Sequence, residues 1–174
     1  MPNSNVGWMG IERFSNYTLC AAEPNSKWKP HSITVRSVES GDIKYKIWMS
    51  REGNPREYYS RLASSWGDNA SFDFYNIDNS FIKIKYLENK SRYALFRLQY
   101  PYELRDDRRG VFERYLKKNS AEIVQLCVFE ENIELLKEFT EYIDIAGIKK
   151  EKLDKLIRES NEEIKDYLGT FANA

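Results

Sequence analysis

Basic side chains alternate with apolar ones in two short stretches of this 174-residue chain, around Lys44 and around Lys83. If the intervening isoleucines face a core, period-two alternation places the cations together on the opposite face of a sheet. Cations beside aromatic rings suit single-stranded nucleic acid, because they neutralise phosphates while the rings stack on bases. A lysine-rich outer face also protects a sheet against edge aggregation, so both interpretations stay open. The candidate nucleic-acid-binding residues are Arg36, Lys44, Lys46, Lys83, Lys85, Arg97, Arg105, Arg108 and Arg109.

Acidic side chains gather at the other end of the chain. The net charge is zero, yet residues 81–118 hold eleven basic and five acidic side chains, whereas residues 119–174 hold seven basic and thirteen acidic ones. This asymmetry concerns partners rather than fold. Acids on short helices would form a negative surface that docks on the basic groove of a nucleic-acid enzyme, or simply a solvated helix face. The candidate partner-binding residues are Glu130, Glu131, Glu134 and Glu138.

Catalytic patterns are weak. The chain has no glycine-rich phosphate loop, no nucleophile with an evident histidine partner and no His-Glu metal box. Two cysteines and one histidine are too few for a four-ligand zinc site without carboxylates. Asp68, Asp73, Asp106 and Asp107 are the carboxylates that a magnesium-dependent nuclease would use, although the last two also fit helix caps. We expect no catalytic residue, no metal and no cofactor.

Composition favours a globular protein. Apolar residues make up 41% of the chain and charged residues 31%, enough for both a core and solubility. No apolar run approaches the roughly 18 residues of a membrane-spanning helix, and residues 1–16 lack a secretory pattern. We expect a cytoplasmic protein that does not bind membranes.

The first two thirds of the chain predict strands. Residues 1–30 read as irregular, and residues 32–49 read as a hairpin with a turn at Gly41. A helix is expected after Asn54-Pro55. Residues 71–100 then read as three more antiparallel strands, with turns at Asp78-Asn79 and at residues 88–91. The expected fold is α+β, built on an antiparallel sheet of about five strands with one or two helices.

The remainder predicts helices. Asp106 or Asp107 caps a helix with an apolar stripe that includes Phe112 and Leu116. From Asn119 onward two helical hairpins are similar to each other at offsets of 30 and 31 residues, and the period resembles that of ankyrin-type repeats. An ordinary four-helix tail is the alternative. The pairs that match are Ile123, Leu126 and Cys127 with Leu153, Leu156 and Ile157, and then Ile133 and Leu136 with Ile164 and Tyr167. We expect a sheet domain at 1–118 and a helical appendage at 119–174.

The order of these parts resembles a known class of small proteins. A sheet that contains Tyr93-Ala94-Leu95-Phe96-Arg97, the stretch Phe112-Glu113-Arg114-Tyr115-Leu116-Lys117-Lys118-Asn119 and a degenerate repeat tail are similar in style to proteins from plasmids and phages of Gram-positive bacteria. Some of those are anti-CRISPR inhibitors of type II effector nucleases. The resemblance implies an inhibitor that binds a host nuclease or its guide RNA.

Three functions follow as expectations. The first is a non-enzymatic inhibitor from a mobile element that blocks a nucleic-acid-guided nuclease. The second is an RNA-processing nuclease that cleaves guide RNA with a carboxylate pair. The third is a protein-interaction or immunity module without a nucleic-acid role. The sequence leaves the oligomeric state open.

Overall fold

The computed structural model describes residues 6–13, 17–24, 31–37, 40, 43–49 and 78–172, and in the four strands it describes the backbone alone. The chain divides into two compact units, residues 1–109 and 110–174. The expected boundary between residues 118 and 119, as a limit of independent folding, stays a prediction.

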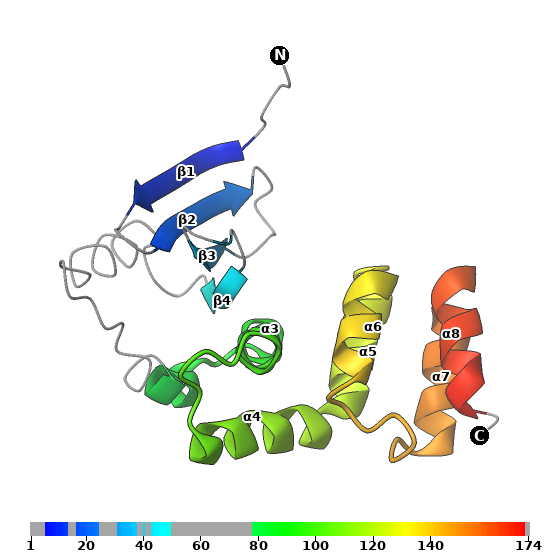
Figure 1. Ribbon diagram of the computed structural model, residues 1–174. Helices are drawn as coiled ribbons and strands as arrows, with labels where there is room; N and C mark the ends of the chain where they lie inside the picture. The colour runs from blue at the N-terminus through cyan, green and yellow to red at the C-terminus, as the bar shows by residue number, and fades with distance from the viewer. Residues whose placement is uncertain are drawn as a thin grey trace. The chain divides into compact units, whose positions relative to one another are not determined.

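Four antiparallel strands in the first unit lie side by side in chain order (Figure 1). They are β1 (Val6–Arg13), β2 (Tyr17–Pro24), β3 (His31–Ser37) and β4 (Ile43–Met49). Ile33 of β3 is opposite Ala21 of β2 and Ile47 of β4. The pairing of β3 with β4 shifts register between Val35 and Arg36, which marks a bulge or irregularity at that point.

The first two strands occupy residues for which an irregular structure was expected. The glycines in Val6–Arg13 weaken its own strand pattern, and pairing with Tyr17–Pro24 supplies what the local sequence does not. The strand expected at residues 72–75 and the helix expected after Asn54-Pro55 lie outside the described residues.

The last strand predicted from the sequence is wrong, because those residues form a helix. α3 spans Leu87–Gln99 and includes both the expected strand and the expected turn at residues 88–91. Every residue from Tyr93 to Leu98 is buried, and such a continuous buried run does not distinguish a strand from a helix by its period. α3 contains no β-branched residue, so intrinsic propensity favours the helix.

The strand expected at residues 82–86 is also absent. Asp78 and Asn79 are helical rather than a tight turn, and the 3₁₀ helix η1 (Ser80–Lys83) follows them. Ile82, which was expected to face the core, is 69% exposed, while Phe81 is buried and packs against the Tyr93 ring with 5.8 Å between the ring centroids. Lys90 places its ammonium 4.8 Å from the centroid of the same Phe81 ring. Within this unit, α3 also contacts β4.

The helical C-terminal region is confirmed. All regular structure described from residue 78 to residue 172 is helical. α4 spans Asp106–Lys118, where Phe112 and Leu116 of the predicted apolar stripe are fully buried. It is followed by α5 (Ser120–Phe129), α6 (Ile133–Thr140), α7 (Lys150–Glu159) and α8 (Glu162–Ala172). No helix among the described residues is long and apolar enough to cross a membrane.

The last four helices form two hairpins, α5–α6 and α7–α8, and α5 also contacts α7 (Figure 1). The second helix of each hairpin begins with the same cap. Asn132 Oδ1 accepts a hydrogen bond from the Leu135 amide at 3.0 Å, and Asn161 Oδ1 accepts one from the Ile164 amide at 3.0 Å. Each cap satisfies an amide that the helix itself leaves without a partner.

These caps correct the predicted repeat offset for the second helices. Asn132 and Asn161 are 29 residues apart, and the same offset matches the buried pairs Leu135–Ile164 and Phe139–Leu168. The predicted offset of 31 instead aligned Leu136, which is fully buried, with Tyr167, which is half-buried. Apolar residues three and four positions apart lie on the same helix face, so the sequence alone allows more than one alignment of α6 with α8. The two asparagine caps fix that alignment at an offset of 29.

Candidate functional site

The structure does not gather the predicted cations on one sheet face. Arg36 lies on β3, and Lys44 and Lys46 lie on β4, where the structure describes the backbone alone. The register shift before Arg36 means that alternation no longer assigns its face. Lys83 and Lys85 are exposed, but they lie on η1 and the segment after it rather than on a strand.

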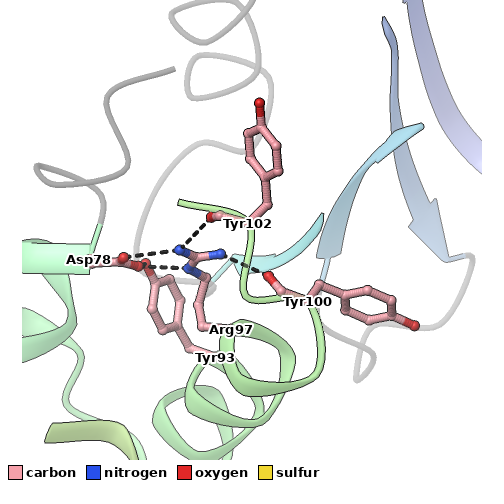
Figure 2. Close-up of polar contacts among 5 residues, drawn as sticks. All are labelled: Asp78, Tyr93, Arg97, Tyr100 and Tyr102. Atoms are coloured by element: carbon pink, nitrogen blue, oxygen red, sulfur yellow. Dashed lines mark hydrogen bonds and ion pairs between the residues drawn. The ribbon is translucent and has the colours of Figure 1, made fainter. Parts of the chain in front are cut away.

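Arg97 is a correction to the candidate set, since its side chain has no exposed surface. Its Nε donates to Asp78 Oδ1 at 2.8 Å, and its Nη2 donates to Asp78 Oδ2 at 3.1 Å. The Tyr93 hydroxyl donates to the same Oδ1 at 3.0 Å (Figure 2). Burial removes Arg97 from any nucleic-acid surface, and the ion pair explains the burial, because a buried charge requires a partner.

Arg97 also bonds the end of its own helix. Nη1 donates to the backbone carbonyl of Tyr100 at 3.0 Å, and Nη2 donates to the carbonyl of Tyr102 at 3.2 Å. Figure 2 shows the guanidinium between Asp78 and these two carbonyls, while the rings of Tyr100 and Tyr102 point away from it. A cation at a helix C-terminus satisfies carbonyls that lack an intrahelical donor.

The remaining arginines lie at the start of α4. Arg105 is exposed and pairs with Asp107 at 3.0 Å, while Arg108 is more buried and approaches the same carboxylate at 3.5 Å. Arg109 is half-buried. Asp106 and Asp107 both lie in the first turn, where acids favour helix formation. Because α4 begins at Asp106, both acids lie within the first helical turn and not at the capping position before it, and Asp107 is paired with cations.

An exposed aromatic beside the lysines was not predicted as surface. Tyr86 precedes α3 and is 63% exposed, next to Lys85. In the strand expected at residues 82–86, Tyr86 would lie on the face opposite Lys83 and Lys85, and the absence of that strand removes this separation. The segment thus presents Ile82, Lys83, Lys85 and Tyr86 together as exposed side chains.

The predicted acidic residues lie on α6 and the turn before it. Glu131, Glu134 and Glu138 are exposed, whereas Glu130 is half-buried at the C-cap of α5. Glu131 has a φ of 51°, a left-handed conformation that ends α5 and redirects the chain into α6. On α6, Glu134 pairs with Lys137 at 3.0 Å.

α8 contacts α6 and also carries exposed acids. The Thr140 and Tyr167 hydroxyls are 2.8 Å apart, which joins the two helices. The hydrogen bond from Lys137 to Glu134 raises the pKa of that lysine, and Glu163 of α8 adds to the effect through its charge. Lys137 therefore lies in the field of carboxylates from both helices. We call the exposed acids of these two helices and their flanks the acidic face: Glu131, Glu134, Glu138, Glu141, Glu162, Glu163 and Asp166.

Phe129 lies at the end of α5, just before the acidic turn that leads into α6, and the sequence did not single it out. It is the last residue of α5, and 85% of it is exposed. It directly precedes Glu130 and Glu131 in the turn between α5 and α6. It follows the apolar run of α5, and such a run does not by itself show where the helix ends and its side chains become exposed.

The carboxylates and cysteines considered for metal binding are only partly among the described residues. Among those residues, no group of three or more His, Cys, Asp and Glu side chains is placed to hold a metal ion. Asp68 and Asp73 lie outside the described residues, and so does Cys20 as a side chain. Cys127 is fully buried in α5, as expected for a small apolar residue.

Comparison with known proteins adds no family. No protein-family model matches the chain, and no curated protein or solved structure is significantly similar to it.

Proposed function

We propose that this chain is a non-enzymatic binding protein of a mobile genetic element that blocks a host nucleic-acid-guided nuclease. The acidic face binds the basic groove in which that nuclease holds its nucleic acid. The observation that supports the proposal is the excess of exposed acids on α6, α8 and their flanks, where the Thr140–Tyr167 contact joins the two helices and Lys137 and Lys165 are the only cations of α6 and α8 against the seven acids of the acidic face. A negative surface of this kind steers association with a positive one and disfavours other partners.

Phe129 is the apolar anchor of the proposed contact. Aromatic side chains that enter a pocket contribute a large share of binding energy, and acids around them select a positively charged rim. The placement of an exposed ring beside Glu130 and Glu131 supports this role. Phe129→Ala is expected to weaken binding by at least about tenfold, with little change in stability because the ring is exposed.

The direct test uses a purified type II effector nuclease loaded with guide RNA. DNA cleavage is measured as the full-length protein is added, and binding is followed by calorimetry at several salt concentrations. Inhibition is expected to saturate near one protein per nuclease, and the affinity is expected to fall as salt rises. Multiple turnover of the inhibitor, or an affinity independent of salt, contradicts the proposal. Shortened guide RNA in the presence of magnesium would instead support the RNA-processing nuclease.

A matched pair of variants tests the acidic face itself. Glu134→Gln with Glu138→Gln removes two exposed carboxylates and the ion pair to Lys137. The control, Glu151→Gln with Glu159→Gln, removes two exposed carboxylates and the ion pair of Glu159 with Lys155 on α7. The first variant is expected to bind about tenfold more weakly, a loss of about 1.4 kcal/mol, while the control binds as the unmodified protein does. Equal weakening of both would show an effect of net charge alone.

A second candidate contact is the guide RNA itself, favoured by the exposed pair Lys85 and Tyr86. A ring stacks on an unpaired base while neighbouring ammonium groups bind phosphates. Lys83→Gln with Lys85→Gln is expected to reduce the salt dependence of single-stranded RNA binding by about 0.7 per charge removed. The control is Lys149→Gln with Lys150→Gln, two exposed lysines of the other unit. No RNA binding by the unmodified chain would exclude this contact and leave the protein–protein contact as the mechanism.

A further inference from the structure

We propose that Arg97 is a lock on the turn between α3 and α4, and that Asp78 holds the lock closed. This role concerns the conformation of the first unit and is independent of the proposed function. It rests on the two directions in which one buried guanidinium donates: toward Asp78 on one side, and toward the carbonyls of Tyr100 and Tyr102 on the other (Figure 2).

The turn contains one tight backbone hydrogen bond and one strained residue. Leu104 donates its amide to the Pro101 carbonyl at 2.9 Å, and Glu103 has a φ of 50°. A non-glycine residue in the left-handed region costs conformational energy, so surrounding contacts must hold it there. Pro101 and Glu103 on either side of Tyr102 are exposed, so their side chains are not packed in the core. The bonds from Arg97 act on the backbone on both sides of Pro101.

Asp78 makes this arrangement possible at a buried position. Without its carboxylate, the guanidinium would be an uncompensated buried cation and would have to move toward water. The carboxylate accepts from two nitrogens of the guanidinium, which fixes its plane as well as its place. The Tyr93 hydroxyl holds the carboxylate in turn. The orientation of the turn is therefore set by an aspartate 19 residues before the arginine.

Hydrogen exchange of the full-length protein tests the lock. Peptides that cover residues 100–105 report on the turn, and peptides from α5 and α6 report on the other unit. In Asp78→Asn and in Arg97→Lys, exchange in the turn is expected to rise at least about tenfold, while α5 and α6 are unchanged. Lysine keeps the charge but lacks the fork that reaches the carboxylate and both carbonyls together. Ser91→Ala removes a hydrogen bond of α3 to the Leu87 carbonyl, away from the turn, and is expected to change exchange in the turn less than about threefold.

The double variant Asp78→Leu with Arg97→Met separates a lock from ordinary packing. Two apolar side chains leave no unpaired buried charge, so the unfolding midpoint is expected to recover relative to Arg97→Met alone. Exchange in residues 100–105 is expected to stay fast, since neither side chain donates to the two carbonyls. Recovery of slow exchange together with the midpoint would overturn the proposal, and so would a turn that already exchanges like an unstructured peptide in the unmodified protein. If the double variant does not fold, Arg97→Lys decides: slow exchange in its turn overturns the lock.

Discussion

Glu122 accepts a 2.7 Å hydrogen bond from the ammonium of Lys152, although thirty residues separate them in the chain. The two residues occupy matching positions near the starts of α5 and α7, because the first helices of the two hairpins align at an offset of thirty. The sequence period is thus present in space as a contact between neighbouring hairpins. In repeat proteins such contacts between neighbours supply much of the stability.

The Glu122–Lys152 pair predicts a small stability effect that depends on pH. The hydrogen bond from Lys152 lowers the pKa of Glu122 below its usual 4.5. The contribution is complete above pH 4.5 and is lost as the pH falls through the lowered pKa of the folded state. Since both side chains are nearly half exposed, Glu122→Gln is expected to cost at most about 0.5 kcal/mol at neutral pH. Urea unfolding between pH 7 and pH 3 measures the difference, and Glu141→Gln is the exposed control. A cost that grows in acid contradicts the pairing.

We expect the two asparagine caps to contribute equally to the free energy of unfolding, because they occupy equivalent positions in the two hairpins. Asn132→Ala and Asn161→Ala each leave an amide of the first helical turn without its acceptor. Each is expected to destabilise the second unit by about 1 kcal/mol, or about 4–8 °C in the thermal midpoint of a domain of this size. Lys149, at the start of α7, makes no side-chain cap, so Lys149→Ala is the control and is expected to be nearly neutral. If Asn132→Ala behaves like that control, the cap does not stabilise α6.

Replacing Ser120 with alanine is expected to lower the free energy of unfolding more than the same change at an ordinary surface serine. Its hydroxyl donates to the Lys117 carbonyl at 2.7 Å and accepts from the Asp144 amide at 2.9 Å, which ties the α6–α7 connection to the start of α5. Ser120→Ala is expected to cost about 1–2 kcal/mol because the Asp144 amide loses its acceptor. Ser160 is the control, because its hydroxyl donates a hydrogen bond to the Ile157 carbonyl within the same helix end. Ser160→Ala is expected to lower the free energy of unfolding by about 0.5 kcal/mol. Comparable losses in chemical unfolding would remove the special role of Ser120.

The thiol of Cys127 is expected to react slowly with maleimide in the folded protein. The side chain is fully buried among the apolar residues of the second unit. A buried thiol reacts only when the helices open, so labelling by a maleimide is expected to be at least about a hundredfold slower than in urea. Peptide mapping separates its labelling from that of Cys20. Labelling of Cys127 at the rate of a free thiol would show that α5 opens readily.

The sequence by itself determined the helical tail. From Phe112 onward, apolar residues recur at helical spacing, and asparagines precede α6 and α8, so local interactions are enough to mark these elements. The offset between the second helices needed the structure, because apolar neighbours on one face allow more than one alignment.

Only the tertiary structure decided the part that contains Arg97. Residues 93–98 are apolar on all sides apart from this arginine, so their period does not choose between a strand and a helix. Arg97 looked like a surface cation because its partner, Asp78, lies in a segment whose local sequence favours a turn. The fold brings the two charges together, and their attraction in a buried place makes the arginine part of the core.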